Sequence, residues 1–351
     1  MGRAQLQSFL ENIYKNIDDK EIWIYGIGNS MDLYCNGLKR INLRISGYCL
    51  DAGFEETAEN IYNEKPVKNI VDLERQNVRI LVFSFNISSM RNMLQKAVKL
   101  GFEAYLLDQI VLSYYRDKVM MVYDLLEDKK SKDILEEVIK CRADGRYPQV
   151  GFWNGNSYFC WPEFTMKNTG KVFIDCGCYV GDTIEKYIWE KEGSFDRIIG
   201  FEPDETNNKA INYRIDRLSK EWNVEGKISV INAGVGEETK RLSFMRHRDG
   251  LGSVFSEKGD RTEQIYALDD FLKEKYDYLK ADIESFEFLM LKGAEKTIKK
   301  WKPCLAICIY HNAVDLFDIP LLIKKIDSKY HFAVRHHSNT FSETVLYAWV
   351  E

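Results

Sequence analysis

The segment Lys171-Val-Phe-Ile-Asp175-Cys-Gly177-Cys-Tyr-Val-Gly181-Asp182-Thr183 decides the fold of this chain. Its apolar run predicts a buried strand that ends at Asp175, and the glycines predict a tight turn into a helix. In parallel α/β sheets such a turn lets backbone approach a ligand, and the helix N-terminus favours negatively charged ligand groups. Asp175 would then accept from a ligand amino group or order the loop. A Gly-x-Gly turn alone is weak evidence, because an ordinary tight turn explains it equally well.

An acidic residue after the next predicted strand strengthens the ligand-binding interpretation. Glu202 lies in Gly200-Phe-Glu202-Pro203-Asp204, roughly twenty residues beyond the turn, where a carboxylate can accept hydrogen bonds from both hydroxyls of an adenosine ribose. A helix-start acid before Pro-Asp is the ordinary alternative. The combination of turn, acid and spacing favours a nucleoside site.

Three further segments follow predicted strand ends. In Asn232-Ala233-Gly234 the asparagine either bonds a base edge or caps a turn. In the segment 280–287 we expect Asp282 to face the reacting group, whereas Glu284 and Glu287 either serve the helix N-terminus or act in the site. His311, after Tyr310, is expected to handle a proton or orient a substrate, although a single histidine is often structural.

The length of 351 residues suits two domains. We predict a small doubly wound α/β domain over 1–112, a helical connector over 113–148 and a larger α/β domain over 149–351. The larger domain is expected to contain strands at 172–175, 197–202, 228–233, 278–282, 304–310, 332–336 and 343–350 and a helix at 288–300. Its last two strands are expected to form an antiparallel hairpin.

The amino-acid composition limits the classes of partner that the chain is expected to bind. The chain has 49 basic and 54 acidic residues, and this balance argues against nucleic acid, which needs a basic surface. No apolar run approaches the roughly 20 residues of a membrane span. The eight cysteines lack metal-ligand spacing and fit reduced thiols in a cytoplasmic protein. We expect a small-molecule or glycan acceptor and no metal, and a homo-oligomer is left open.

Together these segments resemble the FkbM family of S-adenosylmethionine-dependent methyltransferases over roughly residues 150–351. The resemblance rests on residues 172–183, 201–204, 232–234, 268–270, 280–287, 291–294, 310–311 and 343–347. It implies a class I methyltransferase Rossmann-like sheet of order 3-2-1-4-5-7-6, S-adenosyl-L-methionine as cofactor and O-methylation of a hydroxyl on a sugar, glycan or secondary metabolite. The sequence departs from the family at Ser285-Phe286, where Gly-Ala is usual, so larger side chains stand near the expected acceptor site.

The resulting site assignment has three parts. The cofactor-binding residues are expected to be Asp175, Gly177, Cys178, Tyr179, Gly181, Asp182, Thr183, Glu202, Pro203, Asn232 and Ala233. Asp282 and His311 are the candidate bases, and Glu284, Tyr310 and Tyr158 are expected to contact the acceptor. A metal held by Asp282 with Glu284 or His311 is the less favoured alternative.

The polar stretch 241–264, with Gly250-Leu-Gly252-Ser253, is interpreted as a lid or a surface hairpin. The aromatic residues Tyr158, Phe159 and Trp161 are expected to wall the site or fill an inter-domain core.

The N-terminal domain matches only part of the dinucleotide-binding sequence motif. Gly26-x-Gly28 follows a predicted strand and Asp51 ends the next, but Met31 stands where a third glycine is usual. We favour a scaffold or substrate-recruitment role. For the whole chain, the alternatives to a methyltransferase are an NAD-linked or nucleotide-sugar-binding oxidoreductase or recruitment protein that uses the N-terminal domain, and a non-catalytic module that only binds S-adenosylmethionine in its C-terminal half.

Overall fold

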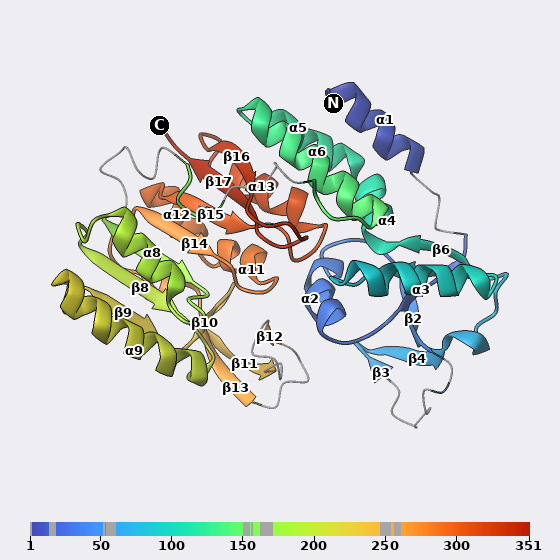
Figure 1. The fold of residues 1–351 in the computed structure, drawn as a ribbon, viewed down its shortest axis with the longest axis horizontal. Helices are drawn as coiled ribbons and strands as arrows, with labels where there is room; N and C mark the ends of the chain where they lie inside the picture. The colour runs from blue at the N-terminus through green and yellow to red at the C-terminus, as the bar shows by residue number, and fades with distance from the viewer. Residues whose placement is uncertain are drawn as a thin grey trace.

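The computed structural model describes residues 2–13, 19–51, 53, 61–149, 155, 157–161, 171–245, 254–255 and 261–351. Two α/β units with separate sheets lie side by side, and a group of helices runs along one edge of both (Figure 1). Mixed α/β structure was expected from the alternation of strand and helix patterns.

The N-terminal unit is a six-stranded sheet of order β3-β4-β2-β1-β5-β6. Its strands are β1 (Glu21–Tyr25), β2 (Ile45–Leu50), β3 (Ile61–Tyr62), β4 (Lys65–Asn69), β5 (Val78–Val82) and β6 (Glu103–Leu106). Only β3 pairs antiparallel. Helices α2 (Asn29–Leu38) and α3 (Ile87–Lys99) and the 3-10 helix η1 (Ile70–Asp72) connect the strands.

The region expected as a connector contributes to the packing of both units. It contains α4 (Leu107–Tyr114), α5 (Arg116–Leu125) and α6 (Lys129–Asp144), and α1 (Arg3–Ile13) packs against α4 and α5. Helix α6 also contacts β16, and Leu126 forms an isolated bridge with Phe332. Apolar residues on several sides of these helices are buried, so the helices do more than link two sheets.

The C-terminal unit is built on a seven-stranded sheet of order β16-β17-β15-β14-β7-β8-β9. Its strands are β7 (Val172–Cys176), β8 (Arg197–Phe201), β9 (Ile228–Ile231), β14 (Tyr278–Ala281), β15 (Cys304–Cys308), β16 (His331–His336) and β17 (Thr344–Trp349). Numbered by chain order within the sheet and read from β9, they run 3-2-1-4-5-7-6. Strand β17 pairs antiparallel with both β15 and β16, so the expected hairpin is present.

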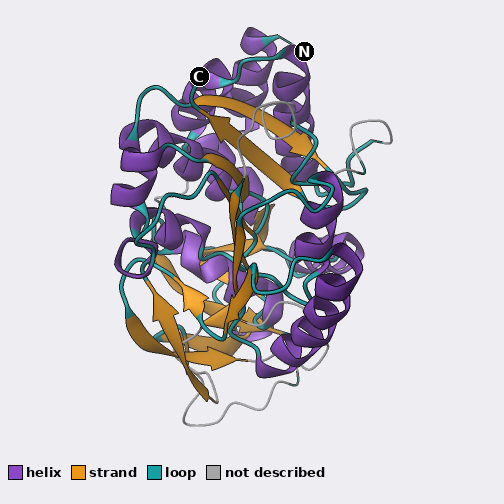
Figure 2. Ribbon diagram, turned by 90° about the vertical axis from the view of Figure 1, so that its left-hand side faces the viewer, coloured by secondary structure: helices purple, strands orange, loops and turns teal. Residues whose placement is uncertain are grey.

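Helices cover both faces of this sheet (Figure 2). Residues of α8 (Asp182–Glu190) and α9 (Glu205–Trp222) share one apolar cluster with Phe173 and Tyr278. Residues of α11 (Glu287–Lys292), α12 (Glu295–Trp301) and α13 (Asp315–Ile326) share another with Ile174 and Leu279. Neighbouring residues of one strand thus enter opposite layers, as the period of two requires.

The helix expected at 288–300 is wrong as a single element, because it is divided into α11 and α12 at Gly293-Ala294. A Cβ on Gly293 would lie 2.0 Å from the main-chain oxygen of Gly236. The chain leaves helical geometry where two backbones touch. This long-range contact leaves no pattern in the local sequence.

A second small sheet, of order β10-β13-β11-β12, lies beside the carboxyl ends of the large sheet's strands. Its strands are β10 (Gly234–Val235), β11 (Lys240–Met245), β12 (Val254–Phe255) and β13 (Arg261–Tyr266), and β11 pairs antiparallel with β13. The polar stretch 241–264 therefore contains part of a hairpin, while the expected lid residues Gly250 to Ser253 fall outside the described residues.

Residues from the N-terminal half of the chain contact the segment that follows β15. Arg40 forms an ion pair with Asp315, and a Cβ on Gly37 would lie 2.4 Å from Oδ1 of Asn312. On α6, Arg142 donates hydrogen bonds to Asp108 and to the main-chain oxygen of Tyr310. Residues that flank His311 are thus positioned from the other half of the chain.

No disulfide joins the eight cysteines, all of which lie in the described part of the chain. Among the described helices, none has both the length and the apolar character that crossing a membrane requires.

Candidate active site

A cavity of about 460 Å³ opens at the carboxyl ends of β7, β8 and β14, where ligands bind in open α/β sheets. Most of its walls come from the strand ends and the segments that follow them. The lining residues are Ser157, Tyr158, Gly177, Tyr179, Asp182, Thr183, Phe201, Glu202, Pro203, Asn207, Gly234, Val235, Phe244, Phe255, Lys280, Asp282, Ile283, Glu284, Phe286, Tyr310 and Glu343.

Glu202 presents a buried carboxylate at the end of β8. Its Oε2 accepts from the Tyr179 main-chain N–H at 3.0 Å, and its Oε1 accepts from the Asp204 N–H at 2.9 Å and from Asn207 Nδ2 at 3.2 Å. Burial raises the pKa of Glu202 to about 7, against these hydrogen bonds, which lower it. The carboxylate is therefore held rigidly and titrates near neutral pH.

The turn into α8 leaves its helix start without a side-chain cap. Gly181 is the N-cap residue with φ of 81°, a left-handed conformation that favours glycine, and Asp182 and Thr183 of the first turn line the cavity. Main-chain N–H groups at such a start favour a negatively charged group. Tyr179, also in the turn, has a positive φ of 49° and is 43% exposed.

Asp175, expected either to accept from a ligand or to order the loop, does not line the cavity. Its buried carboxylate pairs with Lys280 of β14, with Oδ1 and Nζ 3.1 Å apart. Burial raises the pKa of Asp175 to about 6, although Lys280 acts to lower it. Lys280 Nζ also donates to the main-chain oxygen of Gly177 at 2.7 Å. Asp175 therefore orders the loop, the second of its two expected roles.

Gly177 is required by the neighbouring strand. Its φ is 82°, and a Cβ there would lie 2.0 Å from the main-chain oxygen of Asp282. The glycine thus lets the ends of β7 and β14 approach each other. Its contact with the cavity is a consequence of that approach.

Besides Asp175, four expected cofactor residues lie outside the cavity wall: Cys178, Gly181, Asn232 and Ala233. The Cys178 thiol is buried 3.2 Å from the main-chain oxygen of Asp175, and Ala233 is buried. Asn232 Nδ2 donates to the main-chain oxygens of Glu202 and Pro203, at 3.1 and 3.0 Å. Asn232 therefore fixes the backbone around Glu202, which corresponds to the turn-capping alternative.

Asp282 lies at the end of β14 and faces the cavity. Its Oδ2 accepts from the Tyr158 hydroxyl and its Oδ1 from the Tyr310 hydroxyl, both at 3.0 Å. Burial alone would raise the pKa of Asp282, but His311, Lys280 and the two hydroxyls outweigh burial and lower it. Asp282 is therefore a stable carboxylate in the wall.

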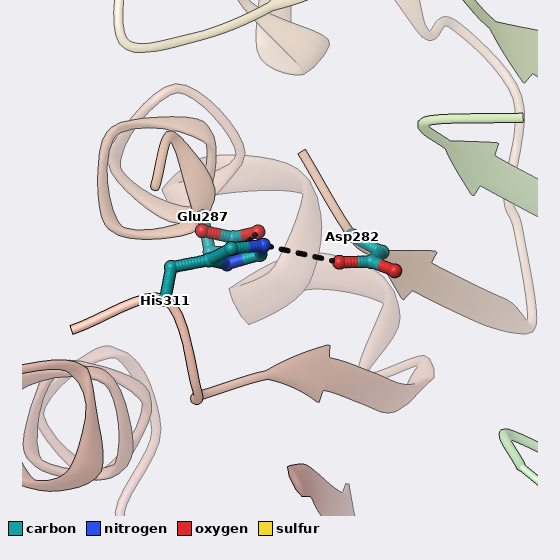
Figure 3. A group of neighbouring side chains, drawn as sticks. All are labelled: Asp282, Glu287 and His311. Atoms are coloured by element: carbon teal, nitrogen blue, oxygen red, sulfur yellow. Dashed lines mark ion pairs between the residues drawn. The ribbon is translucent and has the colours of Figure 1, made fainter. Parts of the chain in front are cut away.

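His311 lies behind Asp282 and is only 1% exposed (Figure 3). Its Nε2 is 3.4 Å from Asp282 Oδ1 and 3.3 Å from Glu284 Oε2, and its Nδ1 is 3.2 Å from Glu287 Oε1. Burial by itself would lower the pKa of His311, but Glu287 and Glu284 raise it well above the ordinary value. The structure thus brings the two candidate bases together, with only Asp282 lining the cavity.

The departure from the family at Ser285-Phe286 has a defined geometry. Glu284 and Ser285 both adopt positive φ, 55° and 70°, in a backbone shape that glycine adopts more easily. The Ser285 side chain is buried outside the lining, whereas Phe286 forms part of the wall and packs against Phe255, with ring centroids 5.3 Å apart. The cavity is therefore narrowed by Phe286.

Sequence reasoning missed Lys280 and Glu343 as site residues. Glu343 lines the cavity 3.5 Å from the Tyr158 hydroxyl, and burial with the charge of Asp282 raises its pKa to about 7. A lysine within the buried strand 278–281 was a usable signal, because buried lysines are usually paired. Glu343 precedes the last strand, and only the antiparallel placement of β17 brings it to this edge.

Two other expectations can be compared with the structure. Phe159 packs against Phe173, and Trp161 against Trp349, so these aromatic residues belong to the C-terminal unit and not to an inter-domain core. In the N-terminal unit, Gly28 begins α2 with φ of 111°, and Asp51 accepts from Tyr25 and Lys96. The acid of the incomplete fingerprint therefore already has protein partners.

The sheet order, the helices on both faces and the cavity at the strand ends define the fold of a class I methyltransferase. Residues 175–332 match the family model described as the methyltransferase FkbM domain.

The fold similarity extends beyond that domain. A methyltransferase FkbM from Methylobacillus flagellatus KT superposes with a TM-score of 0.60 at 19% identity, covering 99% of this chain and 98% of that one. The N-terminal sheet is thus part of the shared fold.

Other solved structures match about half of the chain, and more weakly. An rRNA methylase from Streptococcus thermophilus has a TM-score of 0.33 at 14% identity, over 53% of this chain and 90% of that one. A spermidine synthase from Thermotoga maritima has a TM-score of 0.33 at 12% identity, over 55% of this chain and 59% of that one. These two overlaps are too low to support an inference. No curated protein sequence matches the chain.

Proposed function

We propose that the chain is an S-adenosyl-L-methionine-dependent O-methyltransferase that methylates a hydroxyl of a sugar, glycan or secondary metabolite. The observation that carries the proposal is the Glu202 carboxylate, buried at the end of β8 and facing a cavity of about 460 Å³. It accompanies a methyltransferase domain and fold. A nucleoside is the ligand that this arrangement suits best.

The residues at the cavity fit such a cofactor. Glu202 would accept from the ribose hydroxyls, and the uncapped start of α8 at Asp182 and Thr183 would receive the carboxylate of the methionine part. The cofactor supplies the methyl group: a bond forms between the acceptor oxygen and the methyl carbon while the bond from that carbon to sulfur breaks. Gly177 and Tyr179 complete the proposed cradle, and Asp175 and Asn232 act through the backbone.

Asp282 is the proposed acceptor of the hydroxyl proton. It is ionised and reaches the cavity, whereas His311 is buried and held in its charged form by carboxylates. A hydroxyl becomes acidic as its oxygen gains the methyl group, so a weak base suffices. The hydroxyls of Tyr158 and Tyr310 fix both oxygens of Asp282, which favours alignment of the acceptor, an effect worth up to ~7–11 kcal/mol.

The acceptor would lie against the side of the cavity that carries Phe286 and the carboxylates of Glu284 and Glu343. A second cavity of about 580 Å³, between α2 and β11, shares Phe255 and Phe286 with the first. Carboxylates beside aromatic side chains suit a polyhydroxylated molecule. The carboxylates accept hydrogen bonds from its hydroxyls, and the aromatic rings pack on its apolar faces. This supports an N-terminal contribution to acceptor recruitment.

Calorimetry with S-adenosylmethionine and S-adenosylhomocysteine tests the proposal. We expect micromolar binding that Glu202→Ala weakens by about tenfold or more, because charge-assisted hydrogen bonds of roughly 1.5–3 kcal/mol are lost. Glu205→Ala, at the exposed start of α9, is the matched control and should bind normally. No heat with either ligand, or equal affinity in the Glu202 variant, contradicts the proposal. Binding without turnover on a panel of hydroxylated acceptors would favour the non-catalytic module, and binding of NAD instead would favour the oxidoreductase.

A further inference from the structure

Asp282, Glu287 and His311 form a compact cluster from the two segments that follow β14 and β15 (Figure 3). Each side chain offers one ligand atom, and these atoms lie within 4.8 Å of one another. We propose that the cluster is a binding site for a divalent transition-metal cation. The inference does not depend on the proposed cofactor or acceptor.

Burial makes this cluster different from a group of surface acids. Glu287 is 0% exposed and His311 is 1% exposed. Oε2 of Glu287 accepts no hydrogen bond from any described residue, and neither ring nitrogen of His311 makes one of good geometry with that part of the chain. A buried carboxylate oxygen without a donor is costly, and a cation would satisfy it.

The spacing suits ligation. Nε2 of His311 is 3.4 Å from Oδ1 of Asp282 and 3.3 Å from Oε2 of Glu284. Two ligands at about 2.0–2.2 Å from one cation lie roughly 3.0–3.5 Å apart, so Nε2 and the oxygens of Asp282 and Glu284 stand at ligand spacing already. Glu287 Oε1 is 3.2 Å from the other ring nitrogen, Nδ1, and the ligand atoms of Asp282, Glu287 and His311 lie within 4.8 Å of one another. Glu284, partly exposed on the cavity side, would be an additional ligand or hold a coordinated water.

The neighbouring groups favour a defined coordination. Hydroxyls of Tyr158 and Tyr310 donate to Asp282, and the main-chain N–H of Ile283 donates to Glu287 Oε1 at 2.7 Å. Such contacts orient ligands and leave Glu287 Oε2 available. The positive charge of Lys280 opposes a cation near Asp282, but its own partner Asp175 offsets that charge.

Charge and donor type indicate the class of cation. The two negative charges of Asp282 and Glu287 balance the charge of a divalent ion. A single proton on His311 would balance only one of them. An imidazole nitrogen with carboxylate oxygens suits Mn²⁺, Fe²⁺, Co²⁺ or Zn²⁺ better than Ca²⁺. Because Asp282 also lines the cavity, the ion would lie close enough to polarise an acceptor hydroxyl.

The test uses the full chain, stripped with a chelator and without cofactor or acceptor. We expect about one Co²⁺ or Mn²⁺ per chain, with a Co²⁺ visible spectrum that indicates nitrogen and oxygen ligands. Asp282→Asn, Glu287→Gln and His311→Gln should each weaken binding by at least about tenfold. Glu343→Gln removes a charge beside Asp282 without removing a cluster atom and should retain binding.

Circular dichroism and thermal melting of each variant separate lost ligation from misfolding. Asp282→Asn is the variant to rely on, since it preserves shape at the cavity wall. No cation bound by the wild-type chain, or equal binding by wild-type and folded Asp282→Asn, would overturn the proposal. A loss of binding in Glu343→Gln as large as in Asp282→Asn would also overturn it, because it would indicate a general charge effect. Cofactor calorimetry on the same stripped chain keeps failure of this site distinct from failure of the proposed function.

Discussion

Lys280 and Asp175 form an ion pair inside the C-terminal sheet, with Nζ and Oδ1 3.1 Å apart and both side chains almost fully buried. The pair joins β14 to β7, the two strands whose ends carry Asp282 and the Gly177 turn. Its integrity therefore controls both the stability of the sheet and the shape of the cavity.

Lys280→Met should destabilise the chain by about 3–5 kcal/mol, because it leaves the Asp175 carboxylate buried without a partner. Urea denaturation measures the loss. Adding Asp175→Asn to that variant removes the unpaired charge and should restore a substantial part of the stability. A single variant within about 1 kcal/mol of the wild type would contradict the importance of the pair.

Gly177→Ala should lower the free energy of unfolding more than an alanine substitution at another glycine with a similar backbone conformation. Gly226 has φ of 75° with open space around its Cβ position, whereas Gly177 has φ of 82° and Asp282 O only 2.0 Å away. We expect Gly226→Ala to cost about 1–2 kcal/mol for the left-handed conformation. Gly177→Ala should cost about 1–3 kcal/mol more for the collision, as measured by denaturation. Equal costs would show that strand approach does not require this glycine.

Nucleoside binding should depend on pH through Glu202. Its pKa is raised to about 7 by burial, so in the free protein the carboxylate predominates above pH 7 and the neutral acid below. The charged form accepts hydroxyl hydrogen bonds more strongly, so affinity for adenosine should fall by up to about tenfold for each unit below the pKa. Adenosine is a suitable probe, because it does not titrate between pH 6 and 8.

Calorimetry at several pH values checks this prediction, with Glu202→Gln as the control. The amide cannot ionise, so binding by this variant should be weak and independent of pH over the same range. A wild-type affinity that stays constant from pH 8 to pH 6 would rule out a titrating Glu202 as the ribose ligand.

Arg142→Met should separate the two sides of the proposed site. Arg142 is buried on α6 and donates to Asp108 and to the main-chain oxygen of Tyr310, whose hydroxyl contacts Asp282. We expect a loss of about 3–5 kcal/mol in stability, because Asp108 stays buried, and slower methyl transfer. Affinity for S-adenosylhomocysteine should change less than about twofold, since Glu202 lies elsewhere in the cavity.

Arg91→Met is the matched control for Arg142. Arg91 also donates to a main-chain oxygen, that of Gly145 at the end of α6, but it is only partly buried. It should cost about 1 kcal/mol and leave turnover unchanged. If both variants lowered turnover equally, the contact with Tyr310 would have no special role.

The local sequence was sufficient to predict the elements that are marked by apolar periodicity or by polar residues at strand ends. The strand before Asp175, the turn to α8, the acid Glu202 and the antiparallel pair β16 and β17 follow from apolar runs and the residues that interrupt them. Asp282, Glu284, Tyr158 and Tyr310 were expected near one site, and they line one cavity. Alternation of buried and exposed positions is a local property, so it can be read without the fold.

Tertiary structure alone decided what each polar side chain contacts. Asp175 was expected either to bind a ligand or to order the loop, and the structure pairs it with Lys280 of the neighbouring strand β14. Gly293 divides a helix because the backbone of Gly236 touches it, and Glu343 reaches the cavity because β17 runs antiparallel. The cluster around His311 depends in the same way on the ends of the two strands β14 and β15 and on Arg142. Such contacts join residues far apart in sequence, and their strength comes from burial that only the packed chain creates.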